Sequence, residues 1–70
     1  MNSYEITLWW SEDDSVFVAE VRELPGCMAH GQTELEAIAN VRDAMQLWID
    51  VAREAGDPVP KPRHRRSMHA

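Results

Sequence analysis

The chain has 70 residues, of which 12 are acidic and 7 are basic, so its length predicts a single small domain. Apolar residues make up 44% of the chain and charged residues 27%, a balance typical of a globular domain rather than a disordered chain. The net charge of −5 is unevenly distributed. Residues 1–60 hold every acidic residue and three arginines, a net charge of −9, whereas residues 61–70 carry a net charge of +4.

Composition also excludes several classes of protein. The single cysteine, Cys27, cannot form an internal disulfide, and the three histidines are scattered rather than set at metal-ligand spacing. No basic segment followed by an apolar run opens the chain, and every apolar stretch is far shorter than the roughly 20 residues of a membrane span. We therefore expect a cytoplasmic domain with no membrane segment, no metal and no cofactor.

The first third of the chain predicts a β-hairpin. Residues 4–10 alternate between two faces, and residues 16–22 are rich in β-branched and aromatic side chains. Between them, residues 11–15 are polar and of the kind that hydrogen-bond their own backbone in turns.

A second turn follows at Pro25 and Gly26. Proline presets φ for the first central position of a type II turn, and glycine supplies the positive φ of the second. Residues 27–30 are then long enough for a third, short strand that ends at Gly31.

Residues 33–55 predict one long amphipathic helix. Thr33 and Glu36 have the spacing of a capping box, while Gly56 and Pro58 are typical of a helix end. The apolar positions are Ile38, Val41, Met45, Trp48 and Ala52, flanked by Ala37, Ala44, Val51 and Ala55.

These elements predict an α+β fold, in which a three-stranded antiparallel sheet packs against one helix. Whether residues 56–62 add a fourth short strand is left open. One helix covers one face of a sheet, yet adjacent Trp9 and Trp10 must point to opposite faces. We therefore expect a second copy of the chain to cover the other face, with Trp9, Trp10 and Phe17 as interface candidates. Leu47, on the polar side of the helix, is either a solitary exposed residue or a further contact.

No arrangement of side chains predicts catalysis. Glu12, Asp13 and Asp14 form the one dense carboxylate cluster, which is better explained as a solvated hairpin tip than as a divalent-cation site. Cys27 and His30 would point to opposite faces of a strand. We expect a protein that is not an enzyme.

The basic tail has several interpretations. Lys61, Arg63, Arg65 and Arg66 could contact nucleic acid or an acidic partner, but four cations beside an acidic body make a weak site without stacking aromatics. A solubilising tail is the simpler interpretation. We expect residues 1–60 to form the domain and residues 61–70 to be disordered when free.

In the order of these motifs the chain resembles the HicB family of antitoxins, and the resemblance covers nearly the whole chain, through about Pro62. The run Leu-Pro-Gly-Cys, then Gly-x-Thr and Glu-Ala at the start of a long helix, is fairly specific. The residues that carry the resemblance are Leu24, Pro25, Gly26, Cys27, Gly31, Thr33, Glu36, Ala37, Asn40, Gly56 and Pro60.

The resemblance implies a partial ribonuclease-H-like fold without the metal-binding carboxylates of true ribonuclease H. It also implies an antitoxin that binds and masks HicA, a small mRNA-cleaving toxin, and that forms oligomers. Many HicB proteins continue into a DNA-binding domain that this chain has no room for, so operator binding is not expected.

Two functional hypotheses follow. In the first, the acidic body binds and neutralises a basic HicA-like toxin, with charge complementarity assisting association. In the second, the chain is a solitary HicB-like regulatory or RNA-binding module without a toxin partner, acting through its tail.

Overall fold

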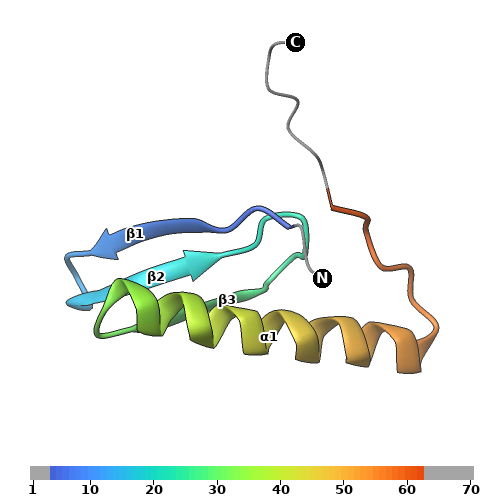
Figure 1. The fold of residues 1–70 in the computed structure, drawn as a ribbon. Coiled ribbons are helices and arrows are strands. Elements are labelled where there is room, and N and C mark those ends of the chain that lie inside the picture. Colours follow the sequence, from blue (N-terminus) through green and yellow to red (C-terminus); the bar gives the residue numbers. More distant parts are fainter. Residues whose placement is uncertain (1–3, 63–70) are drawn as a thin grey trace, which may run out of the picture.

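The computed structural model describes residues 4–62 and folds them into a small sheet lying along one long helix (Figure 1). The elements in chain order are β1 (Thr7–Ser11), β2 (Val16–Glu20), β3 (Met28–Gly31) and α1 (Glu34–Ala55). This order confirms the predicted α+β fold, in which a three-stranded antiparallel sheet packs against one helix.

The sheet has the strand order β1-β2-β3, and both neighbouring pairs are antiparallel. Strand β2 is shorter than the predicted run of residues 16–22 because the chain turns away after Glu20, and β1 accordingly has no partner before Thr7. The Val21 amide donates a hydrogen bond to the Cys27 carbonyl at 3.0 Å, which closes the loop that follows β2.

Residues 57–62 return toward the start of β1 without forming a strand. The Tyr4 hydroxyl donates a hydrogen bond to the Pro60 carbonyl, and Val59 packs against the core. Within residues 4–62 the sheet therefore has no fourth strand, and this segment folds back onto its own chain.

The predicted type II turn is confirmed. The Cys27 amide donates to the Leu24 carbonyl at 2.9 Å across Pro25 and Gly26, and Gly26 has a φ of +83°. In the β1–β2 turn, Ser15 has a φ of +53°, a left-handed conformation that serine seldom adopts.

Both predicted helix ends are also confirmed. The Glu36 amide donates to the Thr33 hydroxyl at 3.1 Å, and the Glu36 carboxylate reaches back to the Gln32 amide. At the other end, Gly56 has a φ of +75° and the Asp57 amide donates to the Ala52 carbonyl at 2.8 Å, which is a Schellman motif.

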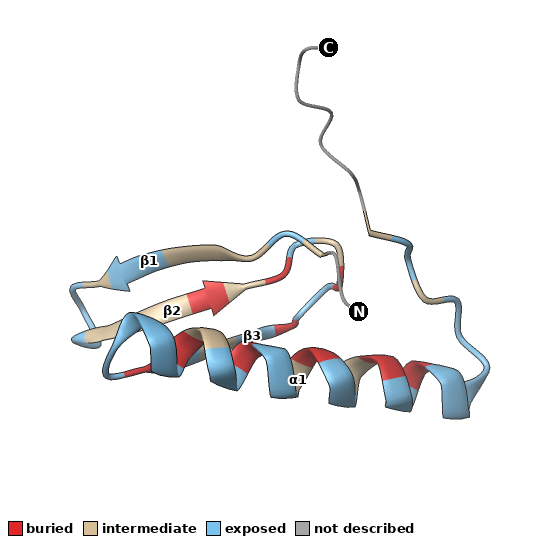
Figure 2. Cartoon of the chain, in the orientation of Figure 1, coloured by how far each residue is buried: buried red, intermediate tan, exposed pale blue. Residues whose placement is uncertain are grey.

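The core lies between α1 and the helix side of β2 and β3 (Figure 2). The buried apolar side chains are Ala19, Val21, Leu24, Cys27, Ala37, Val41, Met45, Ile49 and Ala52. Three helix positions differ from the predicted pattern: Ile49 is buried, whereas Val51, at 55%, and Ala55 are exposed. The buried stripe is therefore rotated away from Val51, because α1 presents the side of Val41 and Met45 to the sheet.

Candidate functional site

The strand register decides which way each tryptophan points. Trp9 lies opposite Val18, which lies opposite His30, while Trp10 lies opposite Phe17 in the neighbouring row. Directly opposite residues point to the same side of a sheet. Ala19 is fully buried beneath α1, so its side of β2 faces the helix. Phe17, two residues before Ala19, and its partner Trp10 are therefore on the helix side, and Trp9 points away from the helix.

We call the side of the sheet that faces away from α1 the open sheet face. Its members are Thr7, Trp9, Ser11, Val16, Val18, Glu20, Met28 and His30. No described element covers this face, and Trp9 is 38% exposed. Its one carboxylate, on Glu20, lies 3.8 Å from the Arg22 guanidinium, so the centre of the face is apolar and close to neutral.

Trp10 is exposed for a different reason. Helix α1 lies along β3 and β2 and makes little contact with β1 (Figure 1), so the helix-side face of β1 is only partly covered. The Trp10 ring instead packs edge-on against Phe17, with ring centroids 4.9 Å apart, and remains 45% exposed.

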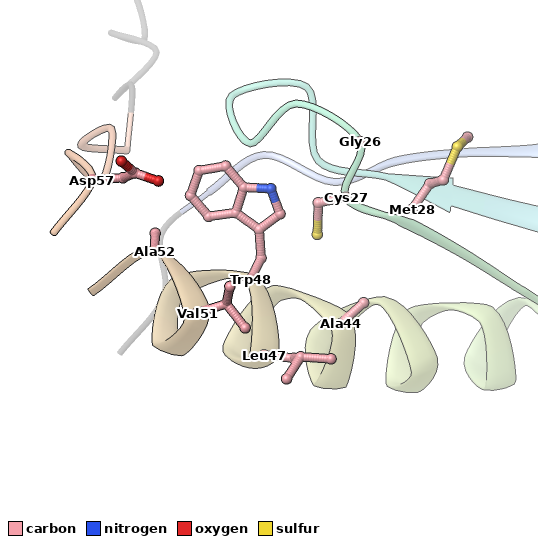
Figure 3. Close-up of a pocket in the computed structure, with 9 residues that line it drawn as sticks. All are labelled: Gly26, Cys27, Met28, Ala44, Leu47, Trp48, Val51, Ala52 and Asp57. Carbon is pink, nitrogen blue, oxygen red and sulfur yellow. The ribbon is translucent and has the colours of Figure 1, made fainter. Parts of the chain in front are cut away.

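A second apolar surface, which we call the helix–strand groove, lies between α1 and the loop that enters β3 (Figure 3). Its volume is about 510 Å³, and its lining is Gly26, Cys27, Met28, Ala44, Leu47, Trp48, Val51, Ala52 and Asp57. Leu47 is 65% exposed. The indole nitrogen of Trp48 donates to the Pro25 carbonyl at 2.9 Å, which fixes that ring against the turn.

The sequence interpretation missed this groove. The sequence pattern places Val51 at the edge of the core and leaves Leu47 either as a solitary exposed residue or as a further contact. The available signal was their spacing: residues four apart lie side by side on a helix, so two exposed apolar residues at this separation mark a patch.

The strand edge beside the groove is partly occupied by the protein itself. The side-chain amide of Asn40 donates to the backbone carbonyl of His30 at 2.8 Å. Asn40 is exposed, yet it ties α1 to the free edge of β3.

Carboxylates border the groove. Asp57 is part of its lining. Three more carboxylates lie on the stripe of α1 next to Leu47: Asp43 is four residues before it, Asp50 three after it and Glu54 seven after it. None of these four exposed carboxylates forms an ion pair with a described residue. By helical periodicity, Arg42 and Arg53 lie on the flank of α1 away from Leu47.

The residues considered for catalysis do not come together. Cys27 is buried, and burial raises the pKa of its thiol, whereas His30 is exposed on the open sheet face. Asp14, of the carboxylate cluster, bonds within the exposed hairpin turn to the Ser11 hydroxyl at 3.4 Å. Within residues 4–62 no three potential metal ligands are grouped, and no helix there has the length and hydropathy of a membrane span.

The basic tail lies largely outside the described residues. Lys61 is exposed, while Arg63, Arg65 and Arg66 fall beyond residue 62. The domain boundary near residue 60 and a nucleic-acid role for these cations stay predictions.

The motif residues have structural roles in the described fold. Leu24 is fully buried, the turn and cap residues act as described above, and Gly31 packs directly under the first turn of α1 beside Ala37. Two of the motif residues, Gly26 and Cys27, also line the helix–strand groove.

Residues 4–70 match the family model described as the HicB-like antitoxin of bacterial toxin–antitoxin systems. The chain is also similar to UPF0150 protein Ta0767 of Thermoplasma acidophilum, with 30% identity over 50 residues that cover 71% of this chain and 72% of that protein. The chain belongs to the HicB-like antitoxin family.

Proposed function

We propose that this protein is an antitoxin that binds and neutralises a HicA-type mRNA-cleaving toxin, without catalysing a reaction of its own. The observation that carries this proposal, beside family membership, is the charge of the described residues. Residues 4–62 hold 12 carboxylates against Lys61 and three arginines, a net charge of −8. A protein that cleaves RNA binds phosphates through basic side chains, so an acidic partner is attracted to the surface that RNA would occupy.

The test uses the reading frame that neighbours this chain's gene. Inducing that frame alone is expected to arrest growth, and co-expressing this chain is expected to restore growth and to yield a complex in a pull-down. Raising the salt concentration should weaken the complex, because charge attraction between exposed groups is screened.

Two controls make the result decisive. A catalytically dead toxin should still bind in the pull-down, which separates binding from any effect on toxin expression. Absence of both a toxic neighbour and a complex would contradict the antitoxin role. A salt-sensitive shift of RNA by this chain would then favour the solitary RNA-binding alternative.

We also propose that a second copy of the chain covers the open sheet face. The support is the nearly neutral strip of exposed Trp9 and half-buried Val18, which two copies can bury symmetrically without placing like charges together. The ribonuclease-H-like relationship stays a prediction of the resemblance.

A further inference from the structure

We propose that the helix–strand groove is the site that receives the toxin, and that its occupant is a basic amphipathic α-helix. This inference rests on the proposed function, because it assigns the toxin's contact to one surface of the antitoxin. The open sheet face is left to self-association, so the two partners use surfaces that share only Met28.

The groove has the size and chemistry of an anchoring site. Its volume of about 510 Å³ lies within the range of ordinary binding pockets, and its lining includes Cys27, Ala44 and Trp48. From Ala44 to Ala52 the lining extends about 12 Å along α1, which matches two turns of an opposing helix. Apolar side chains at positions i, i+4 and i+7 of that helix would therefore all reach the groove.

The edge of β3 argues for a helix rather than a strand. A peptide that extended the sheet would need the outward carbonyl and amide groups of β3. The His30 carbonyl already accepts the Asn40 amide at 2.8 Å, and β3 has only four residues. Too little free edge remains for a further strand, whereas an apolar helix face requires no backbone partner.

Charge argues against a second copy of this chain in the groove. Asp57 lies in the lining, and Asp43, Asp50 and Glu54 follow the exposed stripe beside Leu47. Two copies docked groove to groove would bring these carboxylates together with no described cation between them. Lysine and arginine side chains flanking the anchors of a basic helix would instead pair with the same carboxylates.

The experiment titrates the full chain with a fluorescein-labelled helical peptide of about 15 residues, with leucines at i, i+4 and i+7 among lysines and arginines. Binding is followed by fluorescence anisotropy and by amide shifts in the 15N-labelled chain. We expect shifts at Gly26, Ala44, Val51 and Asp57. The Leu47→Lys variant should bind about tenfold more weakly or worse, because it places a cation at the anchoring point.

Leu35 provides a matched control on the same helix. It is 81% exposed and lies in the first turn, outside the groove, so Leu35→Lys makes the same chemical change and should leave binding intact. A peptide with serines in place of the leucines keeps the charge and should not bind. Equal binding of the serine peptide, or equal loss in both variants, would overturn the proposal. So would groove shifts that depend on chain concentration without peptide, since these would identify a second copy as the occupant.

The same two variants separate this inference from the proposed function. In the growth-rescue assay, Leu35→Lys should protect against the toxin and Leu47→Lys should not. Protection by both variants overturns the groove assignment while leaving the antitoxin role intact. Peptide binding in the groove without protection by the native chain overturns the antitoxin role, and with it the toxin as occupant, while the groove's preference for a basic helix stands.

Discussion

A β-carbon built on Gly31 would lie 2.6 Å from the backbone nitrogen of Ala37, so β3 and the first turn of α1 touch through their main chains. Both residues are buried. An alanine at position 31 must therefore push the helix away from the sheet. We expect Gly31→Ala to lower the free energy of unfolding by about 3 kcal/mol, as measured by urea denaturation followed by circular dichroism.

Gly26 is the control for this substitution. Its φ is +83°, but a β-carbon there would meet nothing within 4 Å. Gly26→Ala should therefore lose only the roughly 1 to 2 kcal/mol that a left-handed conformation costs an alanine. If both variants lost the same free energy, close backbone packing at Gly31 would not be the reason for its glycine.

The hydrogen bond from Asn40 to the His30 carbonyl predicts a smaller effect. Asn40→Ala should lower the free energy of unfolding by about 1 kcal/mol, the usual net value of one such bond. Asn40→Asp should lose at least as much, because an ionised carboxylate cannot donate to a carbonyl. Gln46→Ala, which removes only a surface bond to Asp50, should change stability by a few tenths of a kcal/mol. Equal stability of the native chain and Asn40→Ala would show that this contact adds nothing to the fold.

The features that the sequence predicted are those whose cause is local in the chain. The turn at Gly26 needs a positive φ that proline and glycine together encode, and it has that geometry. The Thr33 cap and the Gly56 helix end are likewise set by residues within five positions of each other. Such features depend on backbone chemistry that does not require knowledge of the packed structure.

The features that the sequence did not predict depend on how distant elements meet. The side of the sheet to which Trp9 points follows from the register of β1 with β2. Alternation alone does not fix this side, because a shift of the register by one residue would exchange the two faces of the strand. The exposure of Val51 follows from the rotation of α1 about its axis, and the Asn40 contact follows from the position of α1 beside β3. These are choices of tertiary packing, so the groove became visible only in the fold.

The buried thiol predicts a pH dependence. Burial raises the pKa of Cys27 above its ordinary value of 9.0, so the folded chain holds this proton more tightly than the unfolded chain does. The protonated thiol therefore contributes to the free energy of unfolding, and this contribution is fully present below pH 9.0. It is lost as the pH rises through the folded pKa, at up to about 1.4 kcal/mol per pH unit. Urea denaturation between pH 8 and pH 11 (a range of about three units) should show this loss.

Cys27→Ala is the control, since it removes the titrating group. Its stability should fall less steeply over the same alkaline range, and the native thiol should react with Ellman's reagent far more slowly than the thiol of the urea-unfolded chain. Parallel alkaline profiles for the two proteins would assign the loss to other groups.

The two tryptophans predict separable effects on assembly and stability. Trp9 lies on the open sheet face, so Trp9→Glu should convert the oligomer to a monomer by light scattering while the chain stays folded. Trp10→Glu removes the edge-on contact with Phe17 on the helix side. It should lower the free energy of unfolding by about 1 kcal/mol in addition to the loss from reduced burial of the ring, and leave the oligomer intact.

Leu47→Glu, in the helix–strand groove, is the control and should change neither the mass nor the fold. A monomeric mass for the native chain at micromolar concentration would refute self-association, and loss of the oligomer in Leu47→Glu alone would place the second copy in the groove.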